Sequence, residues 1–192
     1  MAIYLLKHSS VGKSTHAART AGSHIRYITR PDAKADLLGA RMPIERRAAR
    51  CWLDAQERVI RKNGRVIDKI IIALPRELHP LQRRKLVHDY CETITQGNAP
   101  WFAAIHQTGA DEGNPHAHII IHDRDLKTGR KVAQLSKKNS TLFLRKLWEE
   151  KINAATEKLG YVPKVTRLRK NVVPRNTIVP TSKHDSTYLG RR

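Results

Sequence analysis

The sequence predicts an α+β fold in which an antiparallel β-sheet is flanked by α-helices. Short apolar runs rich in strand-forming residues are interspersed with longer segments of helical spacing, and the last two runs lie close enough along the chain to pair as a hairpin. The chain has 192 residues, 40% of them hydrophobic, which suits one domain with its own core. We expect the helices to pack on one face of the sheet.

The first third of the chain predicts one strand and two helices. Residues 2–7 form a short apolar run typical of a buried strand. A polar stretch separates this strand from a helix over residues 16–29, which must stop before the next proline. Residues 32–42 lack periodicity and are predicted as a loop. Helical spacing of apolar residues, opened by a proline, then predicts a helix over residues 44–62.

The remaining elements have clearer boundaries, which are marked by proline and glycine. Residues 66–74 (VIDKIIIAL) predict a strand that is closed by a proline, and residues 80–95 predict an amphipathic helix. Strands are expected at 101–107 and 116–122, joined by a loop that contains glycine and proline. Residues 140–159 show helical spacing of leucine, isoleucine and alanine. We therefore expect a folded domain at residues 1–162.

The charge of the chain is strongly positive. Its 37 lysines and arginines outnumber 17 acidic residues, which gives a net charge of +20. Such a surplus predicts a polyanionic partner, with nucleic acid first and an anionic membrane surface second. Residues 163–192 carry eight lysines and arginines against one acid and predict a flexible basic tail. Two widely spaced cysteines and no signal or membrane-spanning segment indicate a cytoplasmic protein.

Residues 12–15 (GKST) resemble the end of a phosphate-binding Walker A loop. The complete pattern requires a second glycine five residues earlier, where this chain has Lys7. An ATP site is therefore disfavoured. A basic, hydroxyl-rich loop whose Lys13 touches nucleic-acid phosphates is the better reading, beside the alternative of an ordinary solvated loop.

The motif NPHAH at residues 114–118 is the most informative. Side chains two residues apart on a strand point to the same face, so His116 and His118 project side by side. His106 ends the preceding strand and lies near them if the two strands pair. Three imidazoles make a metal site that keeps coordination positions open for water and substrate. The competing interpretation is that a basic chain with ten histidines carries them on its surface by chance.

Other histidine chemistries fit less well. Histidine-triad nucleotide hydrolases require a third alternating histidine, and this chain has Ile120 at that position. His122 lies on the same strand face but too far along the strand to join the ligands.

A metal beside a basic surface suggests phosphodiester chemistry, which needs a nucleophile. A metal-bound water and a side-chain hydroxyl are both candidates. Tyr4 and Tyr90 lie on apolar faces and are predicted to pack in the core. Tyr27 lies between Arg26 and Arg30, which could hold a phosphate beside the phenol. From these residues alone, Tyr27 fits a core position as well as it fits a nucleophile.

These stretches together resemble plasmid mobilisation relaxases of the MobA/MobL (MobQ-like) type, within the H-U-H endonuclease superfamily. The resemblance rests on MAIYLL, AARTAGSHIRYITR, IIIALPREL and AIHQTGADEGNPHAHIII, and it covers residues 1 to about 122. It implies that His106, His116 and His118 hold a divalent ion, with Mg²⁺ or Mn²⁺ first and other transition metals as alternatives. It further implies that Tyr27 attacks one strand, forms a 5′-phosphotyrosyl link and later reseals the strand.

The implied partners are single-stranded or hairpin DNA at a transfer origin, accessory mobilisation proteins and a coupling protein. Arg26, Arg30 and Lys13 are the candidate phosphate contacts. Many members of the family carry carboxylates on the strand before the ALPxEL turn, whereas this strand reads DKIII. Asp68 and Glu77 are the only acids near it and become the candidate accessory carboxylates. A rolling-circle replication initiator, a transposase of the same superfamily and a non-catalytic DNA-binding protein stay open as alternatives.

Overall fold

The computed structural model describes residues 4–107, 114–158 and 160, so the predicted tail at residues 163–192 lies outside it. The described residues contain one sheet of five strands in the order β1-β3-β5-β4-β2, and every neighbouring pair is antiparallel. The strands are β1 Leu6–Gly12, β2 Asp36–Ala40, β3 Arg65–Ala73, β4 Trp101–His106 and β5 His116–Ile121. The predicted hairpin is confirmed as β4 and β5, and β5 occupies the centre of the sheet.

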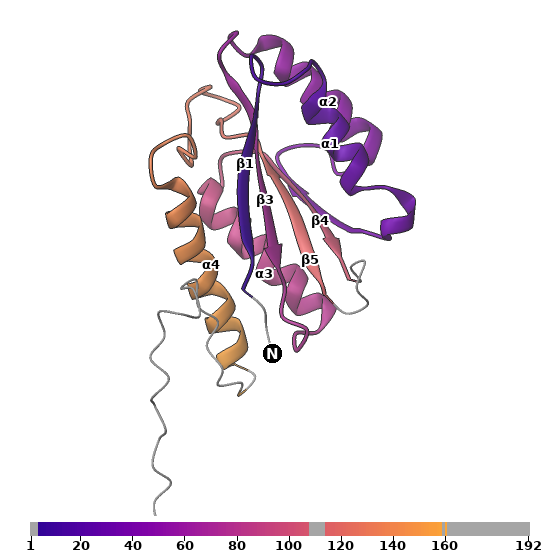
Figure 1. The fold of residues 1–192 in the computed structure, drawn as a ribbon, viewed down its shortest axis with the longest axis vertical. Coiled ribbons are helices and arrows are strands. Elements are labelled where there is room, and N and C mark those ends of the chain that lie inside the picture. The colour runs from indigo at the N-terminus through magenta and orange to yellow at the C-terminus, as the bar shows by residue number, and fades with distance from the viewer. Residues whose placement is uncertain (1–3, 108–113, 159, 161–192) are drawn as a thin grey trace, which may run out of the picture.

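Helices cover both faces of this sheet, so the expectation of a single covered face is wrong (Figure 1). They are α1 Thr20–Ile28, α2 Arg46–Val59, α3 Pro80–Thr95 and α4 Ser140–Glu157, with a short 3₁₀ helix at Pro31–Ala33. Ile119 and Ile121 of β5 pack with α3 and α4, whereas Ile120 packs with α1 and α2. An almost continuous apolar run is typical of a strand buried on both sides.

Two elements differ from their predicted ranges. β1 begins at Leu6 and continues through the stretch expected to be a polar loop, pairing with β3 from Leu6↔Ile72 to Val11↔Ile67. Polar side chains are tolerated there because β1 is an edge strand. β2 lies within residues 32–42, which were predicted as a loop, and it pairs with β4 from Asp36↔Ile105 to Ala40↔Trp101. The prediction of a loop there is wrong.

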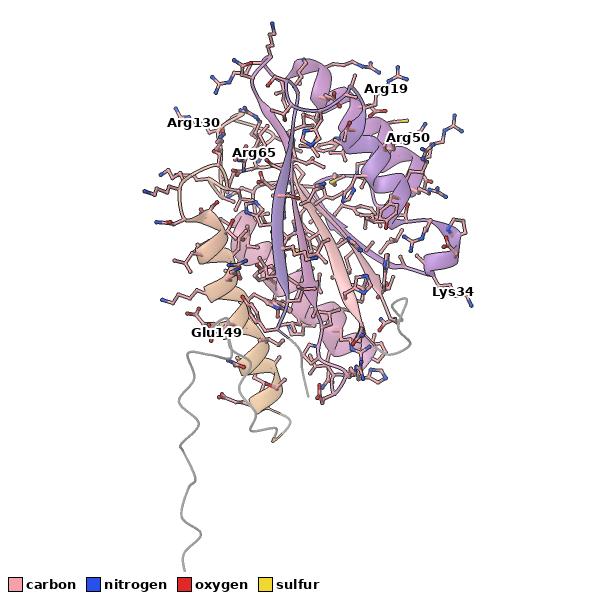
Figure 2. The ribbon with its side chains drawn as sticks, in the orientation of Figure 1. Arg19, Lys34, Arg50, Arg65, Arg130 and Glu149 are labelled. Carbon is pink, nitrogen blue, oxygen red and sulfur yellow. The ribbon has the colours of Figure 1, made fainter. Side chains whose placement is uncertain are left out.

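Helices α1 and α2 form a layer that packs on one face of the sheet, and one side of α1 is exposed. Ile25 and Ile28 of α1 are fully buried in a cluster with Ala49 and Leu53 of α2. The helices approach closely at Gly22, where a Cβ would collide with side chains of α2. Arg19 and Arg50 project from the outer side of this layer (Figure 2). None of the helices in the described part of the chain is long and apolar enough to cross a membrane.

Candidate active site

Three histidines meet at one end of the central hairpin. His106 of β4 lies directly opposite His116 of β5, and His118 follows two residues along the same strand. One ligand nitrogen from each ring lies within 4.8 Å of the other two. The ring centroids are 4.9 to 5.1 Å apart. The structure therefore brings together the three residues that the sequence singled out.

The alternation of the strands explains why all three rings share a face. Ala104 lies two residues from His106 and Ile120 lies two residues from His118, so their side chains point to the same face as the histidines. Both pack against the α1–α2 layer. Ala117 and Ile119 are the neighbours of His118 on β5, so they point to the other face and pack there. The histidines therefore point to the side of the sheet that carries α1.

Two backbone carbonyls fix which ring nitrogens are available. Nε2 of His106 lies 2.8 Å from the carbonyl oxygen of Ile28, the last residue of α1. Because a carbonyl only accepts, the ring donates from Nε2 and keeps its lone pair on Nδ1. Nδ1 of His116 lies 3.1 Å from the carbonyl oxygen of Asn114, which leaves Nε2 of that ring as the lone-pair nitrogen. Such carbonyl contacts are the usual way in which metal-ligating imidazoles are oriented.

Burial lowers the pKa of two of these imidazoles, those of His106 and His118, and so favours their neutral form. Burial and, to a smaller extent, the neighbouring rings of His106 and His116 together lower the pKa of His118 to about 3. Burial also lowers the pKa of His106. Nδ1 of His118 is buried and has no hydrogen-bond partner among the described residues. Three imidazoles that converge in this way, one of them with an unsatisfied nitrogen, are a donor set that fits a divalent metal ion.

Tyr27 lies in the last turn of α1 and is exposed, with 58% of its surface accessible. This excludes the interpretation of Tyr27 as a core residue. Its ring stacks against His24 with the centroids 6.3 Å apart, and the Arg30 guanidinium carbon lies 5.0 Å from the ring centroid. The contact between His106 and Ile28 ties this end of α1 to the histidines.

The three candidate phosphate contacts lie in different surroundings. Arg30 donates to the Tyr27 carbonyl and to Asp32, and its charge contributes to lowering the pKa of His118. Arg26 is exposed on α1. The Lys13 ammonium instead donates to the carbonyls of Arg58 and Ile60 at the C-terminal end of α2, at 3.0 and 2.8 Å. Lys13 therefore caps a helix and lies outside the histidine site.

The candidate accessory carboxylates do not join the histidines. Asp68 faces the opposite side of the sheet, where it contacts His8 at 2.9 Å and Arg65 at 2.7 Å. Its side chain is only 1% exposed. Glu77 follows β3 in the segment that leads to α3 and is half-buried. The structure thus places Asp68 in a separate polar cluster.

The sequence comparisons agree with this geometry. The sequence profile of the MobA/MobL family matches residues 21–173. The chain belongs to the MobA/MobL family. The probable mobilization protein MobA of Bifidobacterium longum (strain NCC 2705) is 30% identical over 161 residues, covering 67% of this chain and 26% of the relative. Mobilization protein A of Escherichia coli is 31% identical over 131 residues, covering 65% of this chain and 18% of the relative. This MobA/MobL chain therefore spans about a quarter or less of these relatives.

Solved structures, among them those of a conjugative relaxase, share the fold of this MobA/MobL chain. A chain from work on the molecular basis of vancomycin resistance transfer in Staphylococcus aureus superposes with a TM-score of 0.63 at 22% identity, covering 88% of this chain and all of that one. The conjugative relaxase TrwC in complex with oriT DNA, in its metal-free structure, gives 0.61 at 14% identity, covering 85% and 73%. Its metal-bound structure gives 0.58 at 16% identity, covering 82% and 71%.

Two residues near the MobA/MobL site, His24 and Lys69, were not predicted from the sequence. His24 precedes Tyr27 by three residues, so both lie on one side of α1. Burial and the charge of Lys69 lower the pKa of His24 to about 4. Lys69 lies on β3 and shares its face with His118. The helical spacing between His24 and Tyr27 could have predicted the position of His24. The alternation of side chains along β3 could have predicted the face on which Lys69 lies.

Proposed function

We propose that this chain is the nicking domain of a mobilisation relaxase, which cleaves one DNA strand at a plasmid transfer origin and later reseals it. The convergence of His106, His116 and His118 beside the end of α1 that exposes Tyr27 carries this proposal. Family membership supports mobilisation over the rival superfamily enzymes, which would use the same kind of histidine site.

The three imidazoles would hold one divalent ion, with Mg²⁺ or Mn²⁺ first and other transition metals as alternatives. Such an ion would supply Lewis-acid polarisation of the scissile phosphate. The protein contributes the orientation of the rings. The carbonyls of Ile28 and Asn114 hold His106 and His116 in fixed tautomers, so the ligand set is ordered before any ion arrives.

Tyr27 would be the nucleophile. Its phenol oxygen forms a bond to phosphorus as the bond from phosphorus to the 3′ oxygen breaks, and the phenol proton is lost while the 3′ oxygen gains one. The product is a 5′-phosphotyrosyl link and a free 3′-hydroxyl, and the reverse attack reseals the strand. Arg30, packed over the Tyr27 ring, would orient the phenol and attract the phosphate.

The substrate would be single-stranded or hairpin DNA at the transfer origin. The net charge of +20 favours phosphate contacts, and accessory mobilisation proteins and a coupling protein would complete the transfer machinery. Arg26 is an exposed candidate contact on α1. The helix-capping contacts of Lys13 make it a weaker one.

The test is a nicking assay with supercoiled plasmids that carry transfer-origin DNA, Mg²⁺ or Mn²⁺, and detergent to trap the covalent complex. We expect a nicked plasmid with protein on its 5′ end, and no nick in EDTA. Tyr27→Phe should lower cleavage by on the order of 10³-fold or more, because the attacking oxygen is absent. Tyr4→Phe is the matched control, because Tyr4 bonds to the backbone of α4 at Arg145.

Two outcomes would reject the proposal in different ways. A covalent link that persists in Tyr27→Phe removes this tyrosine as nucleophile while leaving the metal site intact. Absence of any nick with every metal and origin, together with retained DNA binding, makes the chain a non-catalytic DNA-binding protein.

A further inference from the structure

An uncovered strip of sheet leads away from the histidines. The α1–α2 layer buries Val11, Ile67 and Ile120, but farther along the same face the side chains of β1 and β3 are exposed or half-buried. Residues of the opposite parity on β3, Ile70 and Ile72, are fully buried. We call this surface the β1–β3 strip, and it consists of Lys7, Ser9, Lys69 and Ile71.

The strip is continuous with the histidine site through the register of the sheet. Ile71 pairs with His118, and Lys69 pairs with Ile120. Lys69 therefore lies on the same face as His118, two residues along β3 from the residue that pairs with it. Lys7 pairs with Ile71 on the other side. A path from His118 to the edge of the sheet therefore crosses β3 and then β1.

Lys69 is half-buried and forms no hydrogen bond or ion pair with any residue that the structure describes. The adjacent acid, Asp68, points to the other face and is engaged by Arg65 and His8. The charge of Lys69 instead acts on His24, whose ring stacks on Tyr27. Lys69 thus lies on the face of the sheet that carries α1, and its charge acts on the His24 side chain of that helix.

A half-buried ammonium without an anionic partner is unfavourable, because burial removes water that its charge would otherwise hold. An anion over the strip would offset this cost. Lys7 stands diagonally from Lys69 on the neighbouring strand, at the ~7–8 Å spacing of diagonal pairs in a sheet. The Ser9 hydroxyl lies directly opposite Lys69. Two cations and a hydroxyl in a row match a chain of phosphates better than one isolated anion.

We propose that Lys69 and Lys7 bind consecutive backbone phosphates of the DNA strand, so that the strand runs from the histidines over β3 and leaves across β1. This rests on the proposed function, in which a DNA phosphate is placed at the histidines. Lys69 is a positioning residue for the nicked strand, and it acts without reading the sequence of the bases.

The experiment measures binding of the full chain to a fluorescent single-stranded oligothymidine of about 20 nucleotides in EDTA, over a series of salt concentrations. Lys69→Gln should weaken binding about tenfold, as expected for one charged hydrogen bond. It should also reduce the slope of log affinity against log salt by ~0.7, the value for one single-strand phosphate contact. Lys69→Arg should keep the slope. Lys7→Gln should change the slope in the same direction.

Lys151→Gln is the matched control, because Lys151 is also half-buried but lies on α4, which covers the opposite face. It should leave affinity and slope nearly unchanged. The thermal midpoint of Lys69→Gln should equal or exceed that of the parent, since a half-buried charge is removed. If Lys69→Gln behaves like Lys151→Gln, or if Lys69→Arg loses binding as Lys69→Gln does, the strand does not cross the strip.

The outcome separates the path of the DNA from the chemistry. Nicking by the parent protein, with no slope change in Lys69→Gln, rejects the path and leaves the relaxase standing. A slope change in Lys69→Gln without any nicking supports the strip as a DNA-binding surface and rejects the relaxase.

Discussion

At the scale of single residues, Asp68 shows how a carboxylate near the site in sequence can serve the fold. Its contacts to His8 and Arg65 lie between the sheet and the first turn of α4, where His8 also meets the Thr141 hydroxyl at 2.8 Å. Arg65 continues this network to the carbonyl of Leu135. The cluster therefore joins β1, β3 and the segment before α4.

We expect Asp68→Asn to lower the free energy of unfolding by about 3 kcal/mol, because removing one member of a buried ion pair leaves the other charge uncompensated. Partial exposure of Arg65 keeps the effect at the lower end of that range. Urea unfolding measures the loss, and calorimetry should show unchanged Mn²⁺ affinity. Asp89→Asn, a substitution on the surface of α3, is the control. A drop in metal affinity with normal stability would instead make Asp68 an accessory carboxylate of the site.

The histidine cluster could be predicted because its geometry is local. Alternation along one strand places His116 beside His118, and a short connection brings His106 opposite them. The partners of Lys13 and Asp68 could not be predicted in the same way. Lys13 reaches carbonyls 45 and 47 residues away, and His8 is 60 residues from Asp68. Such contacts depend on the packing of whole elements.

At the scale of elements, strong end signals made some boundaries predictable. The helix expected at residues 80–95 matches α3, because a proline occupies its first turn and a turn that begins at Gly97 follows its end. In the structure Gln96 leaves the helix in the left-handed region at φ 49°. β2 had no such signal. Its five residues form a strand through pairing with β4 alone, and only the folded sheet shows that partner.

Glu92 of α3 connects three elements and predicts a pH dependence of stability. It accepts hydrogen bonds from Arg41 at 2.7 and 3.2 Å and from the Trp101 indole at 2.6 Å. Partial burial opposes ionisation of Glu92, but these hydrogen bonds and the charge of Arg41 outweigh burial and lower its pKa. The ionised form is thus favoured more in the folded state than in the unfolded state.

The stabilisation by Glu92 is therefore present above the unfolded pKa, near 4.5, and is lost as the pH falls through the lowered folded value. At pH 7 we expect Glu92→Gln to be less stable by about 1–2 kcal/mol. The difference in stability should shrink as the pH falls below about 4.5 and should level off below the pKa of the folded Glu92 carboxyl, as measured by urea midpoints across the pH series. If the difference in unfolding free energy between the parent and Glu92→Gln stays constant with pH, the charge of Glu92 contributes nothing to stability.

At the scale of the whole molecule, the sheet separates two surfaces with different tasks. The face toward α1 and α2 carries the histidines, Tyr27 and the β1–β3 strip. The face toward α3 and α4 holds the larger apolar cluster, which includes Trp101 and Trp148. The α+β class was predictable from the spacing of apolar residues. The covering of both faces followed from isoleucine runs in β3 and β5, a signal that the single-face prediction did not use.

The basic residues beyond the described domain supply the last prediction. Residues 163–192 carry eight of the 37 lysines and arginines but only one of the 17 acids. If the nicking domain comprises residues 1–162, removing the rest should leave the thermal midpoint and Mn²⁺ affinity unchanged. Affinity for single-stranded DNA should fall, and the salt slope should shrink by ~0.7 for each phosphate contact that is lost.

A full-length variant with these eight residues changed to glutamine separates charge from length, and it should bind as weakly as the truncated chain. Because the family profile extends to residue 173, a second truncation after that position distinguishes the tail from the end of the domain. A lower thermal midpoint for the shorter chain alone would move the domain boundary to residue 173. Unchanged DNA affinity in both truncations would show that the described domain provides all of the phosphate contacts.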